Sequence, residues 1–384
     1  MKVLSIFGTR PEAIKMAPVV KVLEAESDIT SVVCVTGQHR AMLDQVLGFF
    51  GVRPDYDLDI MVPNQTLNGL TARMLAALEE LLAAVKPDRI LVHGDTTTAM
   101  AASLAAFHRR IPVGHVEAGL RTYDLSQPWP EEFNRRIIDV ASDLLFAPTA
   151  NARDNLEAER LEGCIIITGN TVIDALRLTI DRLNGDSVLL ERTEAQFSQL
   201  RHDRKLLLVT GHRRENFGAG FANICSALAK LSLRDDVEIV YPIHLNPNVR
   251  GPVRDALANR PNIHLIEPQD YLSFVYLMQR AHLILTDSGG VQEEAPSLGK
   301  PVLVMRDVTE RPEALAAGTV VLVGTDPERI VGAAAGLLDA KPVPPIFSPH
   351  RNPYGDGRAA TRIVTALKGK LVEEFPSHNP YSTD

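Results

Sequence analysis

Residues 66–98 read TLNGLTARMLAALEELLAAVKPDRILVHGDTTT, and this stretch predicts the fold. Its first part places apolar residues on one face at helical spacing, which indicates an amphipathic helix. Those residues are Leu70, Met74, Leu75, Leu78, Leu81 and Leu82. Pro87 then marks a turn, and residues 89–93 form a short apolar run of the kind found in buried parallel strands. A helix that leads directly into such a strand is part of a βαβ unit.

The same alternation of short apolar runs and longer amphipathic segments recurs along the chain, so we predict the α/β class. We expect strands at residues 3–7, 31–36, 89–93, 113–117, 144–147, 165–168, 206–210, 237–242, 263–266, 283–286, 302–305 and 320–323. The chain has 384 residues, which is more than one hydrophobic core normally holds. Two doubly wound, Rossmann-like domains are therefore predicted.

The break between the two domains is expected where the chain turns polar and loses its strand signals. Residues 1–170 are predicted to form the first domain, together with a C-terminal segment, 357–384, that begins with a helix over 357–374. Residues 171–204 are expected to connect the domains, and residues 205–356 to form the second.

Composition limits the classes of function. The formal net charge is −8, which does not favour a nucleic-acid partner. Three widely spaced cysteines, Cys34, Cys164 and Cys225, argue against a disulfide framework and indicate a reducing compartment. No apolar run is long enough to span a bilayer, and the N-terminus lacks the pattern of a signal peptide. A cytoplasmic enzyme with no membrane partner is expected.

Reactive side chains follow the predicted strands in both halves. Ligands of open α/β sheets bind outside the carboxyl ends of strands. The polar groups at these places are in residues 8–12, 37–40, 94–98, 117–121, 211–216 and 287–294. Any one of these segments could be an ordinary turn, but so many at equivalent places favour a binding cleft.

Residues 287–294 suggest an anion site. Glycine lets a backbone approach a ligand, and a helix N-terminus offers free N–H groups to a phosphate. Ser288, Gly289 and Gly290 precede a helix in which Glu294 could accept hydrogen bonds from ribose hydroxyls. The alternative is a glycine-rich turn whose acidic residue interacts with the helix dipole.

The sequence bears on two cofactor classes, a nicotinamide dinucleotide and a metal ion. No G-x-G-x-x-G follows the first strand, so NAD is not indicated. His93 and Asp95, like His115 and Glu117, share one face of a strand, and the four could form a metal site. Hydrogen-bonded histidines at strand ends are the more common alternative, so we expect no metal and no cofactor.

The ordered set of motifs in this chain resembles that of the bacterial non-hydrolysing UDP-N-acetylglucosamine 2-epimerases. The motifs are GTRPE at residue 8, HGDT at 93, HVEAGLR at 115, PEE at 130, GHRREN at 211 and DSGG at 287. The resemblance implies a GT-B architecture of two Rossmann-like domains. It also implies a homodimer that interconverts UDP-GlcNAc and UDP-ManNAc for surface polysaccharides.

The resemblance also implies roles for particular residues. Those implied to be catalytic are Asp95, Glu117, Glu131 and His212. Those implied to bind substrate are Arg10, Lys15, Gln269, Phe274, Ser288, Gly289, Gly290, Glu294 and Arg311. Gln38, His39, Arg213 and His244 match residues of an allosteric UDP-GlcNAc site, but Ala41 and Asn64 replace a Gln and an Arg that regulated relatives have.

Several of these assignments have ordinary structural alternatives. Glu131 could simply stabilise the first turn of a helix, and Phe274 could be a core aromatic residue. A GT-B glycosyltransferase, a hydrolysing epimerase and a sugar-nucleotide sensor remain rival functions.

Overall fold

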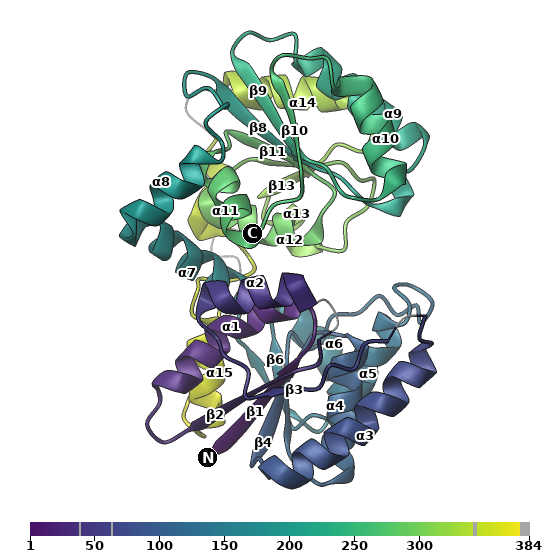
Figure 1. The fold of residues 1–384 in the computed structure, drawn as a ribbon, viewed down its shortest axis with the longest axis vertical. Coiled ribbons are helices and arrows are strands. Elements are labelled where there is room, and N and C mark those ends of the chain that lie inside the picture. Colours follow the sequence, from purple (N-terminus) through teal and green to yellow (C-terminus); the bar gives the residue numbers. More distant parts are fainter. Residues whose placement is uncertain (38–39, 63, 341–343, 377–384) are drawn as a thin grey trace. The chain divides into compact units, whose positions relative to one another are not determined.

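The computed structural model describes residues 1–37, 40–62, 64–340 and 344–376 (Figure 1). They form two compact units. The first contains Met1–Ala175 together with residues 354–376, and the second contains Leu176–Pro353. The division falls inside helix α7 (Thr171–Gly185), so the chain enters the second unit within a helix.

The first unit is built on a seven-stranded sheet in the order β3-β2-β1-β4-β5-β6-β7, with every neighbouring pair parallel. Its strands are β1 (Lys2–Phe7), β2 (Thr30–Val35), β3 (Tyr56–Asp57), β4 (Arg89–His93), β5 (Val113–Val116), β6 (Leu144–Ala147) and β7 (Cys164–Ile167). The order changes direction between β1 and β4, which is the doubly wound arrangement.

The second unit repeats this plan with six parallel strands in the order β10-β9-β8-β11-β12-β13. They are β8 (Lys205–Thr210), β9 (Val237–Pro242), β10 (Ile263–Ile266), β11 (Leu283–Thr286), β12 (Val302–Val304) and β13 (Val320–Leu322). The order changes direction between β8 and β11. The prediction of two doubly wound domains is confirmed.

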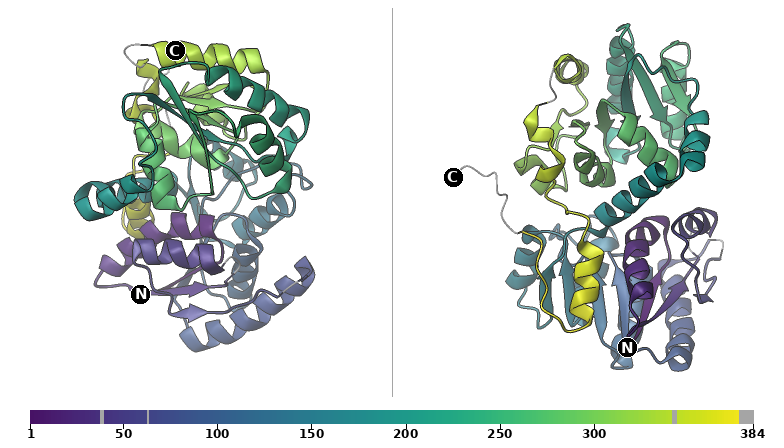
Figure 2. Two further views of the ribbon diagram at one scale, coloured as in Figure 1. Left: turned by 45° about the horizontal axis from the view of Figure 1, so that its top comes forward. Right: turned by 90° about the vertical axis from the view of Figure 1, so that its left-hand side faces the viewer.

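Helices cover both faces of each sheet (Figures 1 and 2). In the first unit they are α1 (Arg10–Ala25), α2 (Arg40–Phe50), α3 (Leu67–Val85), α4 (Thr97–His108), α5 (Glu131–Ala141), α6 (Ala150–Ala158) and α15 (Ala359–Leu367). In the second they are α8 (Ser187–Ala195), α9 (Ala219–Leu231), α10 (Pro247–Leu257), α11 (Tyr271–Arg280), α12 (Gly289–Glu294), α13 (Pro312–Ala316) and α14 (Pro327–Asp339). Among the described residues, no helix is long and apolar enough to cross a membrane.

Alternate residues of β1 explain how one strand supports two cores. Val3 and Phe7 face α1, α2 and α15, whereas Leu4 and Ile6 face α3 and α4. Both faces of the strand are therefore apolar, as expected for a parallel strand covered by helices on either side. Helix α15 is distant in sequence from α1 but packs on the same core (Figure 2).

The structure corrects two sequence predictions. The last helix ends at Leu367, not at 374, because Gly369 adopts a φ of +65° and the N–H groups of Gly369 and Lys370 bond back to Ala366 and Thr365. This Schellman arrangement terminates helices. Strand β3 was missed because its two residues, Tyr56 and Asp57, are exposed at the sheet edge and carry no apolar pattern.

Candidate active site

The loops after β1 and β4 are joined by Glu12. Its carboxylate accepts hydrogen bonds from the backbone N–H groups of Gly8 (3.0 Å) and Thr9 (2.7 Å) and from the Thr96 hydroxyl (2.6 Å). Thr9 and Glu12 form a capping box at the start of α1. Because Glu12 is buried, these three contacts fix the two loops at the point where the strand order reverses.

Glu117, directly after β5, is the most constrained of the predicted catalytic residues. Lys15 Nζ donates to both of its carboxylate oxygens, at 2.6 and 2.8 Å, and the Asn170 amide donates to Oε1 at 3.3 Å. His93 Nε2 lies 2.8 Å from Oε2, within ion-pair distance. Glu117 adopts a φ of +69°, a strained conformation that non-glycine residues rarely adopt and that clusters at functional sites.

The electrostatics of this group favour the carboxylate form of Glu117. Burial alone would raise the pKa of the Glu117 carboxyl, but Lys15 and His93 outweigh that effect and hold the pKa well below its ordinary value. An ionised, buried carboxylate can act as a proton acceptor.

Asp95 lies in the loop after β4 and is held by helix α5. The Arg135 guanidinium pairs with the Asp95 carboxylate, and the Asn134 amide donates to the Asp95 backbone carbonyl at 2.9 Å. The same guanidinium contacts Glu132 at 3.2 Å.

The neighbouring acids of α5 have different surroundings. Glu132 is fully buried and accepts the N–H groups of Thr122 (3.0 Å) and Tyr123 (3.1 Å), so it anchors the loop that precedes the helix. Glu131 is half-buried and has no side-chain hydrogen bond or ion pair within the described part of the chain. Its carboxylate is therefore available to a ligand.

Of the four side chains that could form a metal site, His93 and Glu117 lie together, but Asp95 and His115 have other partners. His93 faces Glu117 and Asp95 faces Arg135, while His115 contacts Asp139 and the Gly94 carbonyl. Within the described ranges, no three His, Cys, Asp or Glu side chains are grouped as metal ligands would be. The geometry gives that alternative no support.

In the second unit, Asp287 organises the loop after β8. This buried carboxylate accepts the backbone N–H groups of His212 and Arg213, both at 2.9 Å, and the Asn216 amide at 3.3 Å. The His212 ring is exposed on one side and stacks on His244, with centroids 5.4 Å apart. Partial burial lowers the pKa of His212, which favours the neutral imidazole.

Two guanidinium groups converge on the Ser288–Gly290 turn. A Cβ placed on Gly289 would lie 3.6 Å from Arg311 Nη2 and 3.8 Å from Arg213 Nη2. Arg311 also pairs with Glu293 through Nε, which fixes the orientation of its guanidinium. The turn thus brings together an accessible backbone and two positive charges.

The remaining predicted binding residues lie at the same end of their units or outside the described chain. Glu294 accepts the Tyr271 hydroxyl at 2.7 Å, and the Gln269 amide donates to the Glu267 carbonyl at 2.6 Å. Phe274 is half-buried on α11, and Arg10 is half-buried at the start of α1. Gln38 and His39 lie outside the described residues.

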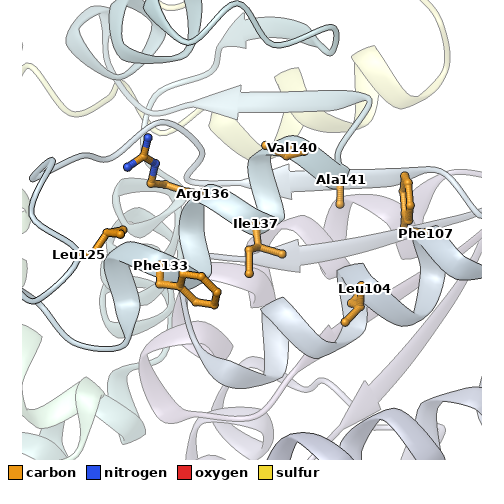
Figure 3. Close-up of a pocket in the computed structure, with 8 residues that line it drawn as sticks. All are labelled: Leu104, Phe107, Leu125, Phe133, Arg136, Ile137, Val140 and Ala141. Atoms are coloured by element: carbon orange, nitrogen blue, oxygen red, sulfur yellow. The ribbon is translucent and has the colours of Figure 1, made fainter.

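An open apolar groove of about 410 Å³ lies elsewhere, between α4 and α5 (Figure 3). It is lined by Leu104, Phe107, Leu125, Phe133, Arg136, Ile137, Val140 and Ala141. None of the predicted site residues lines it, and it offers no carboxylate for acid–base chemistry.

Several residues that support the site have no role assigned from the sequence, although Glu12 and Asp287 lie within its motifs. Glu12 could have been found from its capping-box spacing to Thr9. Asn170, Arg135 and Asp287 carry no such local signal, because their partners are distant along the chain.

Two doubly wound Rossmann-like domains, each with polar residues where its strand order reverses, are the components of the GT-B fold. A family model described as UDP-N-acetylglucosamine 2-epimerase matches residues 21–368. The chain belongs to this family, and it is an isomerase.

Individual relatives agree across nearly the whole chain. The UDP-N-acetylglucosamine 2-epimerase of Salmonella typhimurium is 57% identical over 97% of this chain and all of that protein. The Escherichia coli O157:H7 protein of the same name is 56% identical over the same shares. The crystal structure of the Neisseria meningitidis enzyme bound to UDP-GlcNAc is 52% identical and superposes with a TM-score of 0.87, covering 96% of this chain and 100% of that one.

Proposed function

We propose that this isomerase reversibly epimerises UDP-N-acetylglucosamine at C2 to give UDP-N-acetylmannosamine, without net hydrolysis. Family membership supports the reaction class, and a relative of 52% identity binds UDP-GlcNAc. The proposed route is anti elimination of UDP to 2-acetamidoglucal, followed by re-addition of UDP with protonation from the opposite face.

The chemistry of the substrate favours this route. The C2–H bond of the sugar is not adjacent to a carbonyl carbon, so direct removal and return of the proton would be slow. Elimination breaks the C2–H and C1–O bonds and forms the C1–C2 double bond, and UDP leaves with the electron pair of the C1–O bond. Re-addition reverses each change. The route needs acid–base groups on both faces of the sugar and cations on the diphosphate.

The observation that carries the proposal is the environment of Glu117. A buried carboxylate held ionised by Lys15 and His93 is in the protonation state that a proton acceptor requires. Asp95 and Glu131 supply the other proposed acid–base carboxylates. One of the three removes the C2 proton and another returns it, and His212 acts close to the diphosphate.

The second unit would hold the nucleotide. Arg311 and the Ser288–Gly290 turn would contact the diphosphate, helped by the adjacent Arg213 guanidinium. Glu294 would accept the ribose hydroxyls, and Phe274 and Gln269 would contact uracil. Arg10 and Lys15 would contact the substrate from the first unit.

Three broader assignments belong to the same proposal. The protein would act in the cytoplasm as a homodimer, without a nucleic-acid or membrane partner. An allosteric UDP-GlcNAc site would use Arg213 and His244 with Gln38 and His39. Of this group, Arg213 lies at the Gly289 turn and His244 stacks on His212, so such a site would adjoin the proposed diphosphate site.

Incubation with UDP-GlcNAc alone in D2O, followed by NMR, tests the reaction. We expect UDP-ManNAc with deuterium at C2, because the proton that returns comes from solvent-exchanged carboxyl groups. Free ManNAc would indicate a hydrolysing epimerase, and no reaction until an acceptor is added would indicate a glycosyltransferase.

Carboxamide variants provide the control for the assigned residues. Asp95→Asn, Glu117→Gln and Glu131→Gln keep the side-chain shape but cannot exchange a proton, so each should lower turnover by about 10²-fold or more. Near-native rates in all three would contradict the acid–base assignment.

A further inference from the structure

The Gly94–Asp95 turn, which presents the Asp95 carboxylate, is held by three side chains from outside the turn. His115 of β5 contacts the Gly94 carbonyl, and Asn134 of α5 donates to the Asp95 carbonyl. Arg135 of α5 pairs with the Asp95 carboxylate itself. The two successive backbone carbonyls and the side chain are therefore all fixed from outside.

The role of His115 follows from its two neighbours. Nε2 lies 2.7 Å from the Gly94 carbonyl oxygen, which can only accept, so Nε2 carries a hydrogen. Nδ1 lies 2.6 Å from Asp139, whose other carboxylate oxygen pairs with Arg121 at 2.7 Å. All three side chains are completely buried, so the ring cannot rotate away from Gly94.

Arg135 is fixed in a similar way. Its guanidinium bridges Asp95 and the buried Glu132, and Glu132 in turn holds the backbone of the 122–123 loop. A guanidinium presents its donors in a rigid planar fork, so two carboxylate partners define its plane. Asp95 is consequently restricted in both position and rotation.

We propose that His115, Asn134 and Arg135 are positioning residues that set the orientation of the Asp95 carboxylate for proton transfer. The inference rests on the proposed function, because it assumes that Asp95 reacts with the sugar. A displacement of about 1 Å in a reacting group can cost about 10²-fold in rate, so residues that prevent it act on turnover and not on substrate affinity.

A double-mutant cycle tests the proposal. Arg135→Met is combined with Asp95→Asn, and kcat and KM for UDP-GlcNAc are measured for all four proteins. We expect Arg135→Met to lower kcat about tenfold or more with KM nearly unchanged, and to have no further effect in the Asp95→Asn background. Arg135→Lys, which keeps one donor and the charge, should restore part of kcat. Additive losses would show that Arg135 acts independently of Asp95 and would overturn the proposal.

A second pair of variants keeps the test independent of Arg135. Glutamine places its amide near the position of histidine Nε2, whereas asparagine is too short to reach Gly94. His115→Gln should therefore retain about tenfold more kcat than His115→Asn. Equal kcat values in the two proteins, each shown to be folded by its thermal unfolding, would contradict the role of His115.

The controls separate failure of this inference from failure of the proposed function. Arg153→Met breaks an ion pair with Glu374 at 3.1 Å, remote from Asp95 in the chain, and should leave kcat unchanged. If the wild-type protein formed no UDP-ManNAc, the proposed function would fail. If it did so while Arg135→Met matched it in kcat, only the positioning role would fail.

Discussion

At the residue scale, two of the carboxylates proposed to be catalytic, Glu117 and Asp95, pair with different cations. Lys15 reaches Glu117 from α1, and Arg135 reaches Asp95 from α5. Lys15 is predicted to bind substrate. In the structure, its ammonium donates hydrogen bonds to both carboxylate oxygens of Glu117, which is proposed to be catalytic. Its ammonium therefore affects the protonation of Glu117 whether or not it also contacts a ligand.

Replacement of Lys15 should move the pH dependence of the reaction. Burial raises the pKa of the Glu117 carboxyl, and the Lys15 ammonium lowers it. Without the ammonium, the pKa therefore rises from its lowered value. The carboxyl then becomes protonated at higher pH than in the wild type. In Lys15→Met, the acid limb of the kcat/KM profile should shift upward, whereas Lys15→Arg keeps the charge and should shift it less. An unmoved limb in Lys15→Met would show that Lys15 does not set the protonation of Glu117.

At the element scale, the loop after β1 depends on the absence of a side chain at residue 8. A Cβ on Gly8 would lie 2.0 Å from the Thr36 hydroxyl oxygen and 2.9 Å from that of Thr98. These two hydroxyls hydrogen-bond to each other at 3.1 Å across the ends of β2 and α4. The close packing of three elements at this point brings Gly8 and Thr9 within reach of Glu12.

Gly8→Ala should destabilise the protein by about 1–3 kcal/mol, because buried overpacking forces neighbouring groups apart. The measurement is the free energy of unfolding in urea. Gly48→Ala is the matched control, since a Cβ on Gly48 meets nothing within 4 Å and alanine favours the α2 helix. The free energy of unfolding of Gly48→Ala should be about 0.5–1 kcal/mol higher than that of the wild type. Equal effects from the two substitutions would show that the Gly8 contact is not tight.

At the scale of the whole molecule, the described part of the chain passes between its units twice, at residues 175–176 and 353–354. Within the first unit the outgoing and returning segments are bonded to each other. The Asn170 N–H donates to the Tyr354 carbonyl at 2.6 Å, and Asp174 accepts the N–H groups of Ala359 and Ala360 at the start of α15. Asn170 also contacts Glu117, so this junction adjoins the proposed acid–base site.

The junction should be sensitive to pH. Burial, with a smaller contribution from nearby Asp356, raises the pKa of Asp174 from 3.8 to about 6 despite its two backbone hydrogen bonds. The folded chain thus binds this proton more tightly than the unfolded chain. The stabilisation is full below pH 3.8 and is lost as the pH rises through about 6.

Comparison with Asp174→Asn isolates this contribution. Between pH 4 and pH 8 the wild type should lose up to roughly 3 kcal/mol of unfolding free energy relative to the variant, at about 1.36 kcal/mol per pKa unit. Urea unfolding of both proteins at several pH values measures the difference. A constant difference across this range would show that Asp174 titrates normally.

The sequence alone determined the class of fold and most of the strands. Residues 89–93 and 263–266 were predicted with their observed bounds, because buried parallel strands are continuous apolar runs that need no knowledge of their neighbours. The same local rule located Asp95 and Glu117, since both follow such strands directly. It failed for β3, which has no buried residue, and for the end of α15, where Gly369 decides the boundary.

Only the tertiary structure decided which charges meet. Glu117 and Lys15 are 102 residues apart, and Asp95 and Arg135 are 40 apart. No local pattern links such pairs, because the order of the strands in the sheet brings them together. The sequence thus determined where reactive groups follow strands, and the doubly wound topology determined which cation pairs with each carboxylate.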